Sequence, residues 1–240
     1  MGNESGAGMA DFIRARSAEH KEERLAEVKR AAAALFAERP YYQITLSTIA
    51  EQLSWSRANL YKYVRTKEEI FLSLAEDARD AYADALLAAF TGCGELEPAE
   101  VARRWSGVLM ENEDWFRYLD LLFTIIESNV SQERLVAFKR GYYEMLPALQ
   151  AQLGVAWGVP GTRVAHIMNA VGDQAVGLIV NACASPQEQD ALKELGEEPE
   201  PLDARAELAD FIEMLLAHER VRATAQPARP RTTDHSLRSA

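Results

Sequence analysis

The sequence predicts an all-α fold in which an N-terminal helix-turn-helix head of three helices is joined to a helical-bundle domain. Apolar residues recur every three or four positions through most of the 240 residues, as they do on one face of a helix. No segment alternates apolar and polar residues as a half-buried strand does. Near residue 50, the break Ser54-Trp55-Ser56 separates two short helical patterns. Together these observations indicate helices throughout, with a tight turn between two of the first ones.

The N-terminal part contains one long helix. Residues 1–20 are expected to form a partly flexible extension, because Gly and Ser are frequent in residues 1–12. The long helix is predicted from Arg14 to Glu38, and Pro40 ends it because proline cannot continue a helix. The head that carries the turn is expected to span residues 21–90.

Two short helices flank the turn. The first has an inward apolar face made of Leu46, Ile49, Ala50 and Leu53. Ser56 is placed to cap the second, whose Leu60 and Val64 face inward at a spacing of four. Four residues remain available to face outward: Arg57, Asn59, Lys62 and Tyr63. A polar and basic outer face beside an apolar inner face is typical of a helix that reads the major groove of DNA.

A third helix of the head is predicted from about Lys67 to Phe90. Thr66 and Glu69 stand at capping-box spacing before it, and Lys67 lies at its positive end. A phosphate group docks readily at such a helix end.

The residues of this segment also follow a known order. They are Ile49-Ala50, Ser56-Arg57, Asn59-Leu60-Tyr61, Tyr63-Val64, Thr66-Lys67-Glu68 and Ile70. In this order, residues 20–75 closely resemble the DNA-binding motif of TetR/AcrR-type bacterial transcriptional regulators. The sequence departs from the motif at Ser54 and Ala58, where glycine is common in the family, so the turn geometry and the base preference are the properties affected.

The resemblance implies a double-stranded DNA operator as partner. The residues expected to contact it are Thr45, Ser56, Arg57, Ala58, Asn59, Tyr61, Lys62, Tyr63 and Lys67. Arg57 and Asn59 begin the recognition helix and are expected to reach bases or adjacent phosphates, whereas Lys67 is expected to hold the DNA backbone.

The second part of the chain, residues 91–222, is expected to bind a ligand and to dimerise. Thr91-Gly92-Cys93-Gly94 marks its beginning. Helices are predicted from Pro98 through Leu109 and at 114–128, 131–153, 161–184 and 203–222. The predicted connections are residues 129–130, residues 154–160 and the acidic stretch 185–201. Residues 223–240 contain Pro227 and Pro230 with few apolar groups and are expected to be a disordered tail.

The net charge of −11 is unevenly distributed. Residues 1–70 carry eleven Lys or Arg and ten Asp or Glu, whereas residues 71–222 carry twelve and twenty-six. Because phosphate contact depends on where the cations lie, the acidic total does not exclude DNA. No apolar run reaches the ~18 residues of a membrane span and no signal peptide begins the chain, so we expect a cytoplasmic protein without a membrane partner. Cys93 and Cys183 lack metal-ligand spacing and are expected to be reduced thiols.

Aromatic residues are concentrated between Trp105 and Met145. Core packing explains such residues, but some are expected to line an apolar effector pocket between bundle helices, with a few polar anchors. The candidate ligand-binding residues are Trp105, Trp115, Phe116, Phe123, Glu127, Phe138, Tyr142, His166 and Asn169. We expect an apolar or aromatic-bearing small molecule as effector, and neither a cofactor nor a metal.

The helix predicted at 161–184 is apolar on nearly all sides, so more than one side must be covered. The family resemblance implies that the last two helices of each subunit form a four-helix interface in a homodimer. His166, Asn169 and Asp173 form one polar stripe on this helix, which faces the ligand, the partner or solvent.

Motifs of common enzyme classes are absent from the sequence: no dinucleotide or phosphate-loop glycine pattern, no H-E-x-x-H and no G-x-S-x-G. We therefore expect no enzyme but a one-component transcriptional regulator, a repressor that a small molecule releases from a palindromic operator. The alternatives are a DNA-binding or architectural protein that needs no effector and an all-helical ligand-binding enzyme.

Overall fold

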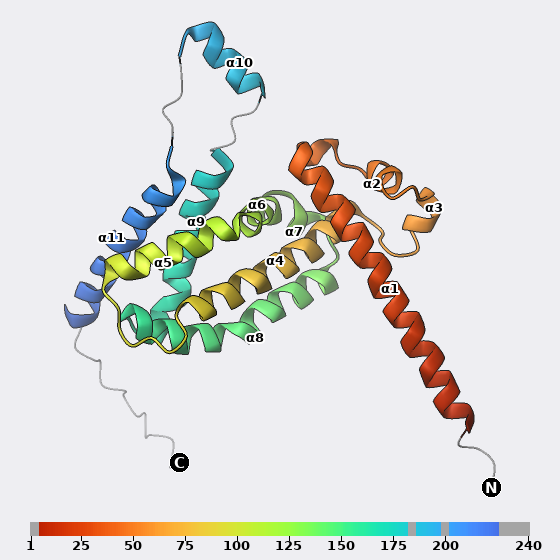
Figure 1. The fold of residues 1–240 in the computed structure, drawn as a ribbon, viewed down its shortest axis with the longest axis horizontal. Helices are drawn as coiled ribbons and strands as arrows, with labels where there is room; N and C mark the ends of the chain where they lie inside the picture. Colours follow the sequence, from red (N-terminus) through yellow and green to blue (C-terminus); the bar gives the residue numbers. More distant parts are fainter. Residues whose placement is uncertain (1–4, 182–185, 198–201, 226–240) are drawn as a thin grey trace, which may run out of the picture. The chain divides into compact units, whose positions relative to one another are not determined.

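The computed structural model describes residues 5–181, 186–197 and 202–225, and the regular secondary structure in these ranges is helical throughout (Figure 1). This confirms the predicted all-α fold. In order, the elements are α1 (Ser5–Glu38), η1 (Tyr41–Gln43), α2 (Leu46–Gln52), α3 (Arg57–Leu60), α4 (Lys67–Ala89), α5 (Pro98–Glu111), α6 (Glu113–Leu121), η2 (Leu122–Ile126), α7 (Glu127–Asn129), α8 (Gln132–Trp157), α9 (Gly161–Asn181), α10 (Pro186–Leu195) and α11 (Ala204–Ala225). Cys183 and residues 226–240 of the predicted tail lie outside the described residues.

The chain divides into two compact units. Unit 1 consists of Met1–Tyr82 and Asn112–Glu144, and unit 2 of Ala83–Glu111 and Met145–Ala240. The sequence predicted a division near residue 90, whereas the packing groups residues 112–144 with the N-terminal head. Two helices, α4 and α8, run from one unit into the other.

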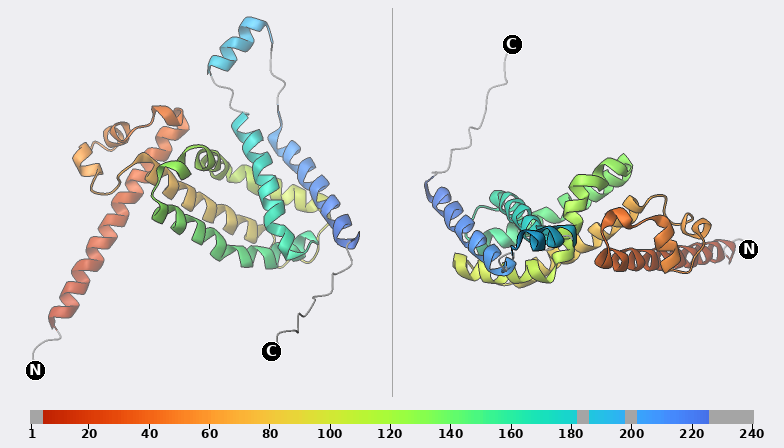
Figure 2. Two further views of the ribbon diagram at one scale, coloured as in Figure 1. Left: turned by 180° about the vertical axis from the view of Figure 1, so that it is seen from behind. Right: turned by 90° about the horizontal axis from the view of Figure 1, so that it is seen from above.

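The core of unit 1 forms where the C-terminal half of α1 meets α2, α3 and the start of α4. Both views of Figure 2 show α2 and α3 beside that half of α1. The fully buried side chains there include Val28, Ile49, Leu60, Ile70 and Phe71. Burying each such side chain contributes about 1.5–3 kcal/mol, and this packing holds the short helices in place because helices so short are not stable alone.

An aromatic cluster in unit 1 joins α6 to the head. The ring of Phe36, near the end of α1, lies 5.6 Å from the Tyr118 ring and 5.4 Å from the Phe71 ring. The Arg117 guanidinium lies 4.9 Å from the Phe36 ring centre and donates to the Phe36 carbonyl oxygen at 3.4 Å. Burial raises the pKa of Tyr118 to about 12, so its hydroxyl stays neutral. Helix α6 is therefore attached directly to the end of α1.

Several predicted boundaries were wrong. Helix α1 begins at Ser5 rather than Arg14, and the predicted 114–128 helix is divided by a π-helical segment, η2. Helix α8 continues through Gly154 to Trp157 and contains Pro147. A Cβ atom on Gly154 would lie 3.2 Å from the Cα atom of Gly161, so glycine there permits the tight approach of the α9 start. Two elements were not predicted. One is the 3-10 turn η1, and the other is helix α10, which lies inside the predicted connection 185–201.

In unit 2, α11 packs on α5 and α9. In the core of unit 2, the rings of Trp105 and Trp157 stack with 4.4 Å between their centres. The Phe90 ring lies at a near-right angle to the Trp157 ring, with 6.2 Å between the ring centres. Glu219 on α11 is buried, and its two carboxylate oxygens accept hydrogen bonds of 2.8 Å from the Arg163 guanidinium on α9. These hydrogen bonds lower the pKa of Glu219.

No helix in the described ranges has the length and apolar character that a membrane crossing requires.

Candidate nucleic-acid interface

The first helix of the candidate interface, α2, starts with a reciprocal cap. The Thr48 amide donates to the Thr45 hydroxyl oxygen at 3.2 Å, and the Thr45 amide donates to the Thr48 hydroxyl oxygen at 3.0 Å. Two otherwise unpaired helix-end amides are thus satisfied. Ile49 and Ala50 are buried as predicted, so the orientation of α2 in unit 1 is set from both its start and its inner face.

The turn after α2 has a left-handed residue. Within the described ranges, Ser54 is the non-glycine residue with a positive φ, +55°. Its amide donates to the Glu51 carbonyl oxygen at 3.0 Å, and the Trp55 amide reaches the Ala50 carbonyl oxygen at 2.8 Å. The backbone therefore needs the conformation that glycine adopts most easily, and the sequence supplies serine instead.

Helix α3 carries the predicted recognition surface. As predicted, Ser56 caps it, with the Asn59 amide donating to the Ser56 hydroxyl oxygen at 3.2 Å. Leu60 and Val64 face inward, with 1% and 5% of their surfaces exposed. The α-helix is shorter than predicted and ends at Leu60, after which turns stabilised by backbone hydrogen bonds such as Tyr63 to Leu60 lead on to Val64. Exposed side chains on this segment are Arg57, Ala58, Tyr61 and Lys62.

The structure brings all nine predicted DNA-contact residues onto one segment of unit 1. The exposed ones are Thr45, Ser56, Arg57, Ala58, Tyr61 and Lys62, and the half-buried ones are Asn59, Tyr63 and Lys67. Tyr63 packs against Trp55 with 5.6 Å between the ring centres, so only part of its ring faces outward.

Lys67 has partners inside unit 1 that the sequence did not predict. Its ammonium nitrogen lies 3.1 Å from the Tyr41 carbonyl oxygen, 2.9 Å from the Ile44 carbonyl oxygen and 3.9 Å from the Tyr41 ring centre. Burial lowers the pKa of Lys67, partly offset by the neighbouring Glu68 carboxylate. Glu68 in turn accepts a 3.0 Å hydrogen bond from the Tyr41 hydroxyl, and burial together with this carboxylate raises the Tyr41 pKa.

The cap before α4 differs in one half from the predicted capping box. The Glu69 amide donates to the Thr66 hydroxyl oxygen at 3.2 Å, as expected. The Glu69 carboxylate, however, accepts from the Arg65 amide at 3.0 Å, one residue earlier than the box requires. Arg65 itself is exposed and was missed by sequence reasoning. The available signal was its position between two lysines already singled out, Lys62 and Lys67.

The candidate ligand-binding residues lie in both units. In unit 1, Phe116 and Phe138 are buried, Trp115, Glu127 and Tyr142 are half-buried, and Phe123 is exposed. Glu127 pairs with Lys139 at 2.5 Å. In unit 2, Trp105 is buried in the Trp157 stack, while His166 and Asn169 are exposed on α9.

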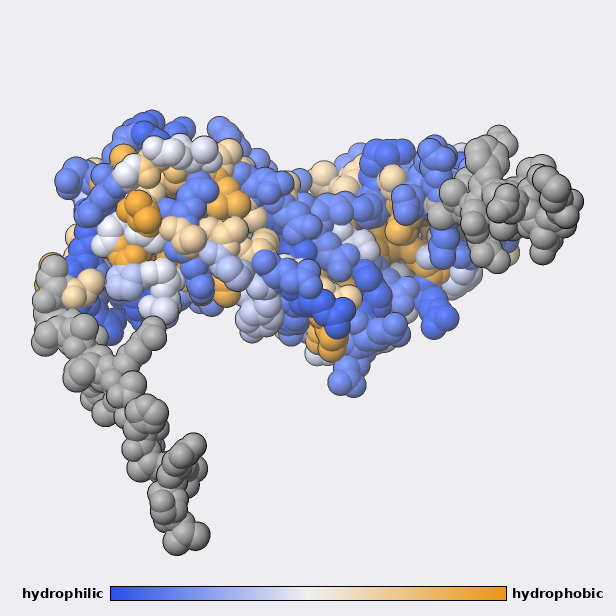
Figure 3. Space-filling view, turned by 90° about the horizontal axis from the view of Figure 1, so that it is seen from below, coloured by the Kyte–Doolittle hydropathy of each residue, from blue (hydrophilic) through white to orange (hydrophobic). Residues whose placement is uncertain are grey.

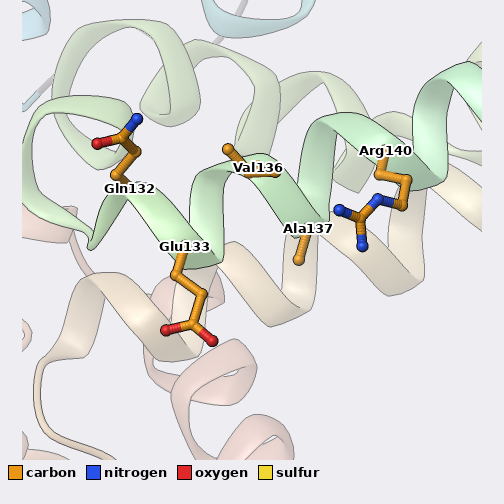
Figure 4. A pocket seen from close by; sticks show the side chains of 5 residues that line it. All are labelled: Gln132, Glu133, Val136, Ala137 and Arg140. Carbon is orange, nitrogen blue, oxygen red and sulfur yellow. The ribbon is translucent and has the colours of Figure 1, made fainter.

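A hollow of about 510 Å³ lies along α8 in unit 1 (Figure 4). Its lining residues, all on α8, are Gln132, Glu133, Val136, Ala137 and Arg140. Its lining includes none of the nine candidate ligand-binding residues. Phe138 and Tyr142, on the same helix, lie on its opposite face, where Phe138 is buried in the core and Tyr142 is half-buried.

Comparisons with known proteins agree with this geometry. Residues 30–74 match the family described as bacterial regulatory proteins of the tetR family, and residues 76–217 match the tetracyclin repressor-like C-terminal domain. The second match alone spans more than half of the chain. A comparison with curated proteins finds no match.

One solved structure with a TM-score above 0.5 supports the same fold. The chain is similar to the fatty acid degradation regulator FadR from Bacillus halodurans, with 15% identity and a TM-score of 0.52 over 80% of this chain and 93% of that one. It is also similar to a TetR/AcrR-family regulator from Thermobifida fusca (21% identity, TM-score 0.47, 81% and 96% covered) and to the TetR-family regulator PfmR from Thermus thermophilus (22% identity, TM-score 0.49, 79% and 97% covered). From the two family matches, the chain belongs to the TetR family of bacterial DNA-binding transcriptional regulators.

Proposed function

We propose that this regulator is a cytoplasmic repressor that binds a palindromic operator as a homodimer and leaves it when a small molecule binds. The observation that carries the proposal is the exposed polar surface of residues 56–62, held by the Ser56 cap and by buried Leu60. On this surface, Arg57 and Asn59 would contact bases or adjacent phosphates, and Tyr61 and Tyr63 the DNA backbone. Lys62 is placed to do either.

A homodimer is proposed through α9 and α11 of unit 2. Large apolar side chains on α11 are exposed in the single chain, Met214 at 63% and Val221 at 66%. On α9, a Cβ atom at Gly177 would meet no atom within 4 Å, so a second chain has room to approach there. Figure 3 shows that apolar side chains, in orange, are exposed among hydrophilic ones on the surface of the described residues. Two heads related by a two-fold axis would meet half-sites about one DNA turn apart or a multiple of it.

An effector site is proposed in unit 1, among α6, η2 and the first part of α8. Aromatic residues of these helices supply apolar surface, and a π-helical segment such as η2 is frequent at functional sites. Arg117 and Tyr118 of α6 hold Phe36 at the end of α1. A ligand that displaces α6 would therefore shift the end of α1, and with it the packing of the head.

The proposal is tested in two steps. First, duplexes bound by the purified protein are selected from a random-sequence library, and we expect an inverted repeat. A pool without sequence preference would instead support the architectural alternative. Second, diverse small molecules are titrated against the protein–operator complex by fluorescence anisotropy. We expect a compound that raises the melting temperature and lowers operator affinity about 5–150-fold. Binders that raise the melting temperature but never change operator affinity would rule out release by a ligand.

A further inference from the structure

We propose that Lys67 is an internal brace of the DNA-binding head, and that Arg65 makes the phosphate contact expected at the start of α4. The assignment rests on DNA binding by the head and concerns which cation meets the backbone. Both residues flank the α4 cap, two positions apart in the chain. The structure separates them by their partners.

The Lys67 ammonium already has several partners within unit 1. An ammonium group has three N–H donors, and two of these point to the Tyr41 and Ile44 carbonyl oxygens at 3.1 and 2.9 Å. A further side of the group is covered by the Tyr41 ring, 3.9 Å from the nitrogen. One N–H donor remains, but turning the ammonium outward to a phosphate would weaken both carbonyl hydrogen bonds and the contact with the Tyr41 ring.

The brace connects the start of α4 to the start of α2. Tyr41 contacts Lys67 through its ring and its carbonyl, and its hydroxyl donates to Glu68. Its ring also packs at a near-right angle to the Phe71 ring, with 4.9 Å between the ring centres. The segment that Lys67 holds leads directly into Thr45, the cap of α2. Loss of the ammonium would therefore loosen η1 and the position of α2, an effect on stability rather than on phosphate attraction.

Arg65 has the opposite surroundings. Its side chain is exposed, and its guanidinium has no hydrogen-bond or ion-pair partner among the described residues. Its backbone is nevertheless held, because its amide donates to the Glu69 carboxylate. It belongs to the same exposed connection as Tyr61 and Lys62. A free guanidinium on a fixed backbone suits phosphate, which it can bind through two parallel hydrogen bonds.

The two roles differ in their salt dependence. A fluorescein-labelled duplex of mixed sequence serves as probe, and its affinity is measured by anisotropy from about 50 to 200 mM KCl. Arg65→Gln should reduce the slope of log K against log salt by about 0.9 per bound protomer, so that the affinity lost over this range becomes about 3.5-fold smaller for each protomer. Its melting temperature should stay at the wild-type value.

Lys67→Met should do the reverse, lowering the melting temperature and leaving the slope unchanged. Lys193→Gln removes a cation whose side chain is 76% exposed on α10, and as the matched control it should change neither quantity. A reduced slope in Lys67→Met with a normal melting temperature, or an unchanged slope in Arg65→Gln, would overturn the assignment.

A measurement on the wild-type protein keeps the test valid even when Lys67→Met does not fold. Amine-reactive labelling is followed by mass spectrometry with and without the duplex. Lys62 should react in the free protein and be protected by DNA, while Lys67 should react slowly in both samples. Fast labelling of Lys67 that DNA suppresses would overturn the brace. A wild-type protein that binds no duplex would refute the DNA-binding surface itself. A wild-type protein that binds the duplex, with a salt slope that depends on Lys67 and not on Arg65, would refute only the assignment of the two residues.

Discussion

Replacing Ser54 by glycine should stabilise the protein, although it removes a side chain from a structured turn. Ser54 has a φ of +55°, its side chain is exposed, and its hydroxyl has no hydrogen-bond partner among the described residues. The substitution therefore removes steric strain between Cβ and the backbone without removing a side-chain interaction.

The size of the effect follows from two opposing contributions. A left-handed conformation costs an L-residue with a Cβ atom roughly 1–2 kcal/mol, and glycine avoids this cost. Glycine also gives the unfolded chain more freedom, which destabilises the folded state by about 0.4–1 kcal/mol. The net gain in the free energy of unfolding is therefore between about 0 and 1.6 kcal/mol, with about 0.8 kcal/mol at the midpoints of the two ranges. For a chain of this size it corresponds to a rise of about 1–4 °C in the melting temperature.

Urea denaturation followed by circular dichroism measures this difference, and thermal melting provides a second reading. Ser54→Ala is the matched control, because alanine also loses the hydroxyl but keeps the Cβ atom, and it should give no comparable gain. If the glycine variant is no more stable than the alanine variant, the steric explanation is refuted. Operator affinity of the glycine variant should remain at least as high as in the wild type, since the hydrogen bonds of the turn are made by its backbone.

The remaining predictions concern base reading, dimerisation and acid stability. Asn59→Ala should relax selection at one base-pair position by roughly 1–3 kcal/mol in a repeat of the duplex selection, and unchanged base preferences would contradict a base contact. Met214→Glu should give a folded monomer with weak operator binding; a dimer of normal stability in light scattering would place the interface elsewhere. Glu219→Gln should flatten the loss of stability in acid. Because Arg163 lowers the Glu219 pKa, the stabilisation is present above the unfolded value near 4.3 and lost as the pH falls through the lower folded value. Urea titrations between about pH 3 and 6 measure this, and identical pH profiles for variant and wild type would contradict it.

Features that depend on neighbours in the chain could be predicted from the sequence. The Ser56 cap and the inward faces of Leu60 and Val64 follow from residues three and four positions apart, where helical geometry decides the contacts. The left-handed turn was likewise visible at Ser54, because the motif calls for glycine at that position.

Features that depend on distant residues could not be predicted in this way. The carbonyl partners of Lys67 lie 26 and 23 positions earlier, one in the 3-10 turn η1 and one directly after it, in a segment without an apolar period. Arg117 reaches a carbonyl 81 positions away. The stacking of Trp105 on Trp157 could not be predicted, because Trp157 lay in a stretch predicted to be a connection. In each case the local pattern was compatible with more than one partner, and the packing of the folded chain determined which partner was used.

The two helices that have residues in both units, α4 and α8, differ in how easily they bend. Helix α4 crosses from unit 1 to unit 2 at Tyr82–Ala83 and has neither glycine nor proline between Lys67 and Ala89. Helix α8 crosses at Glu144–Met145, and Pro147, three residues on, lacks the amide that would bind the carbonyl of Tyr143. A helix with all of its backbone hydrogen bonds resists bending, whereas a helix that lacks one bends first at that position. The absence of proline and glycine makes α4 the stiffer of the two helices, whereas Pro147 makes α8 the one that bends first under load.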